Sequence, residues 1–234
     1  MAEDINDAMK NLRCDLHTHT VHSRDSLTTL SDFLAACLRK GLDRVAVTDH
    51  NAISGALQLH EMDPKRIIVG EEIRTTHGEL IAYFLSELVP AGLAPQEAIA
   101  AVRAQGGIVG VSHPLDSFRR EAMGRAALLP LLDQLDFVEG FNARCLLPGD
   151  NRAAQALARE RGLATTAGSD AHCVWELGRG VTVMPAFDSP SSFLTSLRAA
   201  RIGGRMTPFW IHLVSSYAKV ARRVKGASPG AREE

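Results

Sequence analysis

Short apolar runs rich in β-branched residues alternate along this chain with longer stretches rich in alanine, leucine and arginine. The sequence predicts strands at 13–19, 43–50, 66–75, 78–85, 108–114, 136–144, 164–172 and 180–185. It predicts helices at 27–42, 95–107, 151–163 and 189–204, and residues 76–78 ("THG") form a predicted hairpin turn. Strands that alternate with helices are typical of a parallel sheet or a βα barrel.

The composition favours one soluble domain. The chain has 234 residues, of which 45% are hydrophobic, and a net charge of −1, so it lacks the overall positive field that grips nucleic acid. Its four cysteines are scattered without a C-x-x-C pair, which indicates free thiols in a reducing cytosol. The polar, acidic N-terminus is not a signal peptide, and no apolar run is long enough for a membrane span. We therefore expect a cytoplasmic α/β protein.

Side chains that bind metals follow the predicted strands at the points where they end. His17 and His19 stand two residues apart in "DLHTH", so in a strand both point to the same side. The other strand ends carry His50, Glu71, Glu72, His113, Asn142, Asp170 and His172. In a βα barrel the carboxyl ends of the strands meet on one face. Imidazoles and carboxylates crowded there would suffer desolvation and repulsion, which divalent cations relieve.

The motifs "DLHTH…RDS…TDH…GEEI…SHP…GSDAH" resemble those of the polymerase and histidinol phosphatase (PHP) family of metal-dependent phosphoesterases, over residues 13–185. The resemblance implies a distorted seven-stranded (β/α) barrel with two or three metal ions at the strand ends. We expect a flexible N-terminal tail (1–12), the barrel domain (13–205), a C-terminal amphipathic helix (206–226) and a disordered end (227–234).

The resemblance also implies a set of metal ligands. The matching positions are His17, His19, Asp25, His50, Glu72, Glu79, His113, Asp170 and His172. Many relatives carry a histidine where this chain has Glu79. We favour Glu79 over His77 as the ligand, because His77 precedes a glycine in a tight turn. Imidazole and carboxylate ligands without thiolate suit manganese, iron or zinc.

We expect phosphoester hydrolysis by metal-activated hydroxide, with Asp170, His172 and Arg144 as catalytic residues. Asp170 would orient the water or accept its proton, and a histidine at the rim or a bound water would protonate the leaving oxygen. Arg144 would bind the substrate phosphate through its planar guanidinium. Arg24, Arg119 and Arg120 are weaker candidates for this role.

The expected substrate is a small phosphorylated metabolite or a nucleotide. Three alternatives stay open at this point: an exonuclease acting on nucleic-acid ends, an amidohydrolase-like hydrolase, and a catalytically silent scaffold. The net charge of −1 argues against long nucleic acids, whereas the basic C-terminal stretch Lys219–Lys225 leaves such a contact open. No lysine stands at a strand end to bridge metals as in amidohydrolases, and every ligand position retains a ligand-type residue.

Overall fold

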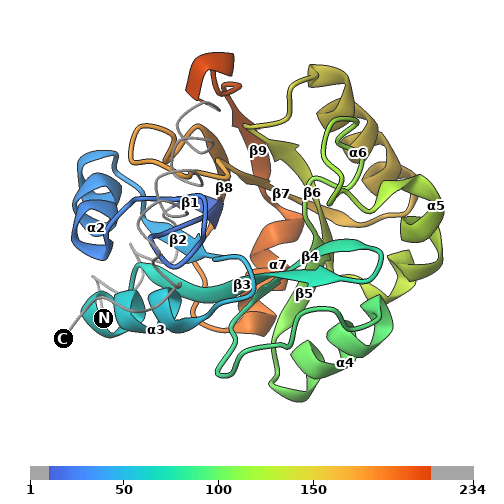
Figure 1. The fold of residues 1–234 in the computed structure, drawn as a ribbon, viewed down its shortest axis with the longest axis horizontal. Coiled ribbons are helices and arrows are strands. Elements are labelled where there is room, and N and C mark those ends of the chain that lie inside the picture. The colour runs from blue at the N-terminus through green and yellow to red at the C-terminus, as the bar shows by residue number, and fades with distance from the viewer. Residues whose placement is uncertain (1–10, 212–234) are drawn as a thin grey trace.

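Nine strands within residues 11–211, the part of the chain that the computed structural model describes, form one sheet that curls into a nearly closed barrel (Figure 1). The strands are β1 (Asn11–Thr18), β2 (Arg44–Val47), β3 (Ile67–Thr75), β4 (Gly78–Tyr83), β5 (Ile108–Val111), β6 (Phe137–Asn142), β7 (Ala164–Gly168), β8 (Gly180–Pro185) and β9 (Arg201–Gly204). The α-helices are α2 (Leu30–Arg39), α3 (Ser54–Met62), α4 (Pro95–Ala104), α5 (Gly124–Leu128), α6 (Pro148–Glu160) and α7 (Pro190–Arg198). Two 3-10 helices cover Leu129–Gln134 and Phe209–Ile211.

The strand order around the sheet is β7-β6-β5-β4-β3-β2-β1-β8-β9. Neighbouring strands are parallel from β1 through β3 and from β5 through β7, whereas β4 runs antiparallel to both of its neighbours. The predicted hairpin around residues 76–78 is confirmed as the β3–β4 connection. The strands β8 and β9 pair antiparallel beside β1.

The sheet has nine strands rather than the seven expected, and β9 lies where the sequence predicted the end of a helix. The helix α7 ends at Arg198, and residues 201–204 pair with β8. Two glycines explain the difference, because Gly203 and Gly204 are poor helix formers. A Cβ atom at Gly204 would also stand 2.0 Å from the carbonyl oxygen of Arg179, so only glycine allows this close approach.

The segment after β7 closes the barrel against the end of β1. The amide of Asp170 donates to the carbonyl of His17 at 2.7 Å, and the amide of His19 donates to the carbonyl of Ala171 at 2.9 Å. A Cβ atom at Gly168 would lie 2.2 Å from the Cβ of His17, so glycine permits this approach. The two segments that carry the H-x-H and D-x-H motifs are therefore held side by side.

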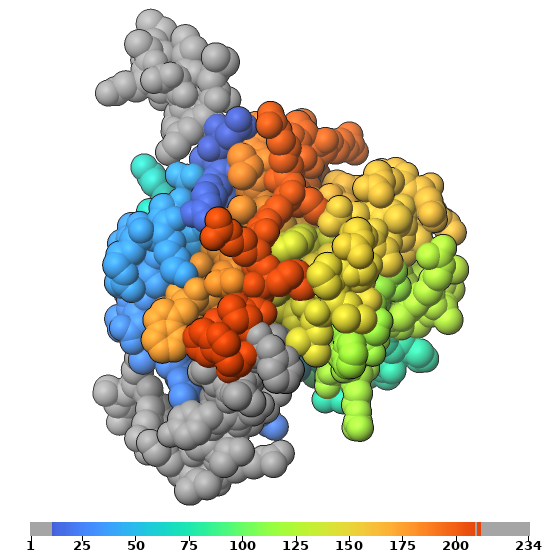
Figure 2. Space-filling view, turned by 90° about the horizontal axis from the view of Figure 1, so that it is seen from above, coloured from blue at the N-terminus to red at the C-terminus, as the bar shows by residue number. Residues whose placement is uncertain are grey.

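The hydrophobic core has an inner and an outer layer. The inner cluster includes Leu16, Tyr83, Phe137 and Phe193, and α7 supplies Phe193 from one end of the barrel (Figure 1). The Tyr83 hydroxyl donates to the carbonyl of Leu16 at 2.6 Å, which satisfies the one polar atom of this side chain. The outer cluster packs the surrounding helices onto the strands. In Figure 2 the segment around β9 (orange to red) lies between the N-terminal part (blue) and the region of α6 (yellow).

Several predicted features lie outside the described residues or at their edge. The strand β1 already begins at Asn11, two residues before the predicted start of the barrel domain. Of the predicted C-terminal helix 206–226, residues 206–208 are not helical and Phe209–Ile211 form a 3-10 turn; the rest lies outside the described residues. Among residues 11–211, no helix combines the length and the apolar character that crossing a membrane requires.

Candidate metal centre

The nine side chains predicted as metal ligands come together at the carboxyl ends of the parallel strands. They reach this place from six parts of the fold: the end of β1 and the loop after it, the segment after β2, the interior of β3, the start of β4, and the segments after β5 and β7. All of them are buried except His50, which is half-buried. The strand-end pattern in the sequence therefore corresponds to one cluster in space.

The carboxylate of Glu72 stands at the centre of this cluster. Its Oε2 lies 3.3 Å from His17 Nε2, 3.5 Å from His19 Nε2 and 2.9 Å from His50 Nδ1. Its Oε1 lies 2.9 Å from His113 Nε2. Since four imidazoles surround the two oxygens of one buried carboxylate, Glu72 is placed where a bridging ligand would be needed.

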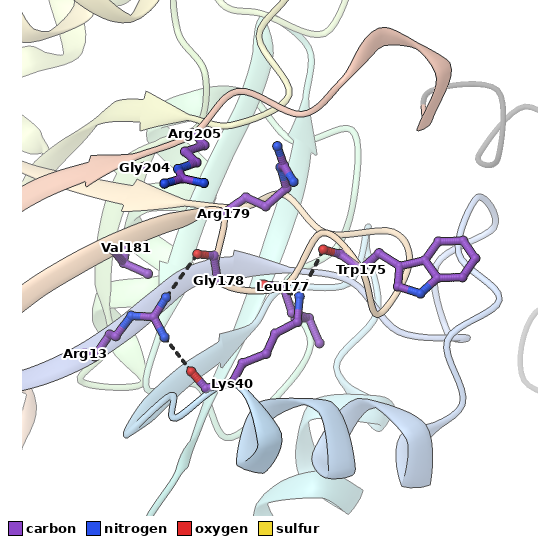
Figure 3. Close-up of a pocket in the computed structure, with 9 residues that line it drawn as sticks. All are labelled: Arg13, Lys40, Trp175, Leu177, Gly178, Arg179, Val181, Gly204 and Arg205. Atoms are coloured by element: carbon purple, nitrogen blue, oxygen red, sulfur yellow. Dashed lines mark hydrogen bonds between the residues drawn. The ribbon is translucent and has the colours of Figure 1, made fainter.

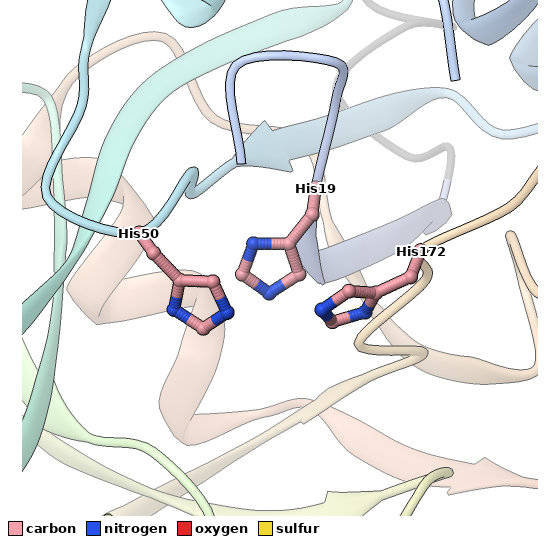
Figure 4. A group of neighbouring side chains, drawn as sticks. All are labelled: His19, His50 and His172. Atoms are coloured by element: carbon pink, nitrogen blue, oxygen red, sulfur yellow. The ribbon is translucent and has the colours of Figure 1, made fainter. Parts of the chain in front are cut away.

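His19, His50 and His172 form a second group whose rings face a common space (Figure 4). The ring centroid of His19 lies 4.4 Å from that of His50 and 4.4 Å from that of His172. Asp25 contacts two of these rings, with Oδ1 3.2 Å from His172 Nε2 and Oδ2 3.7 Å from His50 Nε2. Three imidazoles and a carboxylate therefore surround one point, as the ligands of a divalent cation do.

Asp170 connects the cluster to the protein around it. Its Oδ1 lies 3.1 Å from His19 Nε2, and its Oδ2 lies 2.5 Å from Arg119 Nη2. The backbone of Asp170 has φ of +52°, and that of His113 has φ of +28°. Residues other than glycine rarely adopt a positive φ. Those that are held in this strained backbone conformation are concentrated at functional sites.

The structure places Glu79 in the cluster and His77 outside it. Glu79 Oε2 lies 3.7 Å from His113 Nε2, and Glu79 Oε1 lies 3.9 Å from His50 Nδ1. Burial, together with the charge of Glu72, raises the pKa of Glu79 to about 7. His77 is exposed in the hairpin turn, where its Nδ1 lies 2.9 Å from the hydroxyl of Thr76.

An outer layer of polar side chains, which the sequence analysis did not identify, fixes the imidazoles. Glu139 lies 2.9 Å from His17 Nδ1 and accepts a 2.7 Å hydrogen bond from the amide of His113. Ser23 lies 3.2 Å from His19 Nδ1 and donates to Asp49 at 2.6 Å. A signal was present, because Glu139 is an acidic residue in the middle of the buried strand β6.

The cluster contains buried polar atoms that the protein leaves without hydrogen bonds. Among the described residues, these include His17 Nε2, His19 Nε2, Glu72 Oε2 and Asp170 Oδ1. Four sets of three side chains each bring one nitrogen or oxygen within 4.8 Å of the others. The sets are His19, His50, His172; His17, His113, Asp170; His17, His19, Glu72; and His50, Glu72, Glu79. Inward-facing donor atoms without partners fit bound cations, because such atoms are costly to leave unsatisfied.

The pKa values within the cluster also indicate a site that suits bound cations. Burial lowers the pKa of His17, but the carboxylates of Glu72 and Glu139 outweigh burial and raise the pKa well above its ordinary value. Burial raises the pKa of Glu72, but His17 and His50 outweigh it and hold the pKa well below its ordinary value. Protonated imidazoles thus balance the carboxylates without metal, and cations would take over this charge.

A cleft of about 800 Å³ opens onto the cluster. Its walls include His50, Glu79 and His172 together with Arg24, Arg74, Arg119 and Arg144. Arg144 is 6% exposed, and its Nε lies 3.4 Å from Glu176 Oε1. Arg119 and Arg24, the weaker candidates from the sequence, also line the cleft, whereas the exposed Arg120 is not among the residues that line it. Four guanidinium groups at the mouth of a cluster of donor atoms suit an anionic ligand.

Comparisons with known proteins agree with these observations. A PHP domain model matches residues 15–110, and a PHP-associated model matches residues 148–202. An uncharacterized protein of Methanocaldococcus jannaschii is 33% identical over 197 residues, which cover 80% of this chain and 79% of that protein. The probable phosphatase YcdX of Escherichia fergusonii is 26% identical over 88% of this chain and 98% of its own length.

A solved structure shows the same fold. It is the crystal structure of a two-domain protein from Bacteroides vulgatus that contains a predicted PHP-like metal-dependent phosphoesterase. The TM-score is 0.67 at 21% sequence identity, and the match covers 85% of this chain. The chain spans 66% of the length of that larger protein.

Proposed function

The chain belongs to the PHP domain family of metal-dependent phosphoesterases, and on this premise we propose that it hydrolyses the phosphate ester of a small phosphorylated metabolite or a nucleotide. The observation that carries the proposal is the set of buried nitrogen and oxygen atoms without hydrogen bonds, at the end of a cleft lined by arginines.

The donor set suits two or three divalent ions. His17, His19, Asp25, His50, Glu72, Glu79, His113, Asp170 and His172 would hold them, with Glu72 shared between ions. Imidazole and carboxylate donors without thiolate suit manganese, iron or zinc. When bound, such ions lower the pKa of water towards about 7 and neutralise the charge of a phosphate group.

Asp170 is the candidate for handling the proton of the attacking water. Its Oδ1 is directed into the cluster, and the guanidinium of Arg119 holds its other oxygen at 2.5 Å. Burial raises the pKa of Asp170, but Arg119 and His17 outweigh burial and hold the pKa well below its ordinary value. The group therefore stays ionised, which suits a ligand that orients water through a hydrogen bond.

His172 and Arg144 face the substrate side of the cluster. His172 Nδ1 donates to the backbone carbonyl of Asp170 at 2.8 Å, which leaves Nε2 as the nitrogen available for a cation or a proton. Arg144 lines the cleft with its guanidinium anchored near Glu176, a geometry that suits binding of phosphate oxygens. Preorganised donors of this kind stabilise the charge that develops on phosphate.

An amidohydrolase-like reaction is less well supported. Amidohydrolases usually bridge their metals with a lysine, and residues 11–211 contain two lysines. Lys40 follows α2 and Lys65 precedes β3, so neither lies at the carboxyl end of a strand.

The test combines elemental analysis with hydrolysis of an aryl phosphate monoester and a bis-aryl diester in the presence of manganese. We expect two to three metal ions per chain and turnover of at least one ester. The preference for the monoester or the diester then narrows the range of candidate substrates. Bound metal without turnover of either ester would favour amide or lactone substrates. A protein that takes up no manganese and has no activity would contradict the proposal.

A further inference from the structure

A second pocket, whose lining includes none of the candidate metal ligands, carries an excess of positive charge. Its volume is about 500 Å³, and its nine lining residues are Arg13, Lys40, Trp175, Leu177, Gly178, Arg179, Val181, Gly204 and Arg205 (Figure 3). Four of them are cationic, and none of these lining residues is acidic. Proteins seldom gather uncompensated cations around a cavity without an anion to bind.

Two of the four cationic side chains are already hydrogen-bonded to backbone carbonyls of the pocket wall. Arg13 donates to the carbonyls of Lys40 and Gly178, and Lys40 Nζ donates to the carbonyls of Trp175 and Leu177 at 2.9 Å and 2.7 Å. The buried carboxylate of Asp15 accepts a hydrogen bond from the amide of Gly178 at 2.7 Å. These contacts explain why the pocket keeps its shape, but not why two further arginines line it.

Arg179 and Arg205 are the cations that the fold does not use fully. Arg179 Nη2 donates to the carbonyl of Met206 at 2.7 Å, whereas its buried Nε has no hydrogen-bond partner among the described residues. Arg205 is exposed, and its amide donates to the carbonyl of Arg179 at 2.8 Å, which keeps the two residues adjacent. The guanidinium of Arg179 therefore keeps one donor unsatisfied within residues 11–211, and the exposed Arg205 adds a second charge beside it.

Trp175 adds an aromatic surface at the rim. Its side chain is 65% exposed, which is unusual for so large an apolar ring. Figure 3 shows the indole on the outer side of the pocket, beyond Leu177 and on the side away from Arg205. An exposed indole at the rim offers a stacking face for a base, and the cations that line the pocket offer charge for its phosphates.

We propose that this pocket is a second binding site, separate from the metal centre, for a nucleoside polyphosphate. Arg179 and Arg205 bind the phosphate oxygens, and Trp175 stacks on the base. The pocket volume falls within the range of ligand sites for molecules of this size.

The pocket shares a segment of the chain with the metal centre, so that a ligand bound in the pocket can affect the candidate metal ligands. Trp175, Leu177, Gly178 and Arg179 line the pocket and follow the candidate ligand His172 closely along the chain. The carbonyls of Trp175, Leu177 and Gly178 are held by Arg13 and Lys40. In the same segment, Glu176 accepts the amide of His172 at 2.8 Å. A ligand that draws on the cations would thus act on a segment that also positions His172.

The test uses the full chain loaded with metal, in excess magnesium, with adenylyl imidodiphosphate as a non-hydrolysable probe. The chain has two tryptophans, so Trp210→Phe leaves Trp175 as its one tryptophan, which is read by selective excitation above the tyrosine absorption band. We expect saturable quenching of Trp175 that weakens with added salt. In this background, Arg179→Gln with Arg205→Gln should raise the Kd about tenfold or more, because each removes a charge-assisted hydrogen bond.

The matched control is Arg144→Gln, which removes a guanidinium from the catalytic cleft and should leave the Kd unchanged. Loss of binding in Arg144→Gln but not in the Arg179/Arg205 variant would assign the probe to the catalytic cleft and overturn the proposal. The absence of quenching at millimolar concentrations of the probe would also overturn it. Inorganic tripolyphosphate that binds as tightly as the probe would overturn the role of Trp175 in holding a base. Melting curves of each variant separate loss of binding from loss of folding.

Discussion

The carboxylate of Glu139 lies 2.9 Å from His17 Nδ1, and both side chains are fully or almost fully buried. This contact selects the tautomer of His17 that carries its proton on Nδ1, so that Nε2 is directed at Glu72. The same carboxylate accepts the amide of His113, so one outer residue orients two candidate ligands from different strands.

We therefore expect Glu139→Gln to weaken metal binding by about 10–100-fold, the usual cost of losing a carboxylate behind a metal-bound imidazole. Glutamine keeps the size and an acceptor oxygen, so the fold should survive. Titration against a chelator of known affinity measures the change. Unchanged metal affinity in a folded Glu139→Gln protein would show that Glu139 does not support the metal centre.

Two adjacent acids provide a matched pair of substitutions. Glu72 contacts four imidazoles, whereas the Oε2 of Glu71 accepts a hydrogen bond from the amide of Val89 at 2.9 Å. We expect Glu72→Gln to lose at least one metal ion per chain and more activity than any outer-layer variant, because it removes the only carboxylate that all four rings share. Glu71→Gln should keep its full metal content. Elemental analysis compares the two, and equal metal content would contradict a bridging role for Glu72.

The positions of Glu79 and His77 make a second pair. Glu79 is 5% exposed and reaches toward His50 and His113, while His77 is exposed in the turn two residues earlier. Glu79→Gln should lower the affinity of the most weakly held ion, since one anionic donor is lost. His77→Ala should leave metal content and turnover as they are. If His77→Ala loses metal instead, the assignment of these two residues is reversed.

The barrel fold and the gathering of the candidate ligands at one place could be predicted from the sequence, whereas the number of strands could not. Candidate ligands such as His17 and Asp170 could be recognised because strand ends meet at one face whatever the details of packing. Glu72 does not follow this rule, because it lies inside β3 rather than at its end. Glu139 escaped notice because its role depends on the side of β6 that faces His17, which follows from packing rather than from a strand end. The strand β9 was missed because it exists only through pairing with β8, and local pattern alone does not reveal such pairing.

The metal-stripped protein should lose thermal stability as the pH rises from 5 to 9. Burial raises the pKa of Glu71 to about 7, and His17 and His50 also have pKa values raised well above their ordinary value. For each of these groups the folded state holds the proton more tightly, so its stabilisation is present at low pH and is lost as the pH rises through the folded pKa. The lowered pKa of Glu72 acts in the opposite direction only at more acidic pH, and the lowered pKa of His19 does so only up to about pH 6.5, the ordinary pKa of histidine.

Melting curves at several pH values check this expectation. The melting temperature should fall by several degrees over the range, at about 2–4 °C per kcal/mol for a chain of this size. Glu71→Gln should make the fall shallower between pH 5 and 7, because it removes one of the responsible groups. Manganese should stabilise the protein more at pH 8 than at pH 6, since ligands bind metal in their deprotonated forms. A melting temperature that rises over this range would contradict the expectation.

Substitutions at Arg144 and Arg119 should distinguish a residue that binds substrate from one that supports metal binding. Arg144 lines the cleft and is anchored near Glu176, outside the set of candidate ligands, whereas Arg119 contacts the carboxylate of Asp170. Arg144→Ala should therefore raise the KM for an aryl phosphate about tenfold or more with metal content unchanged, because it removes a charge-assisted contact worth about 1.5–3 kcal/mol. Arg119→Ala should lower both metal affinity and kcat, because Asp170 loses the group that orients it. A loss of metal in Arg144→Ala would show instead that Arg144 supports the fold of the centre through Glu176 and His172.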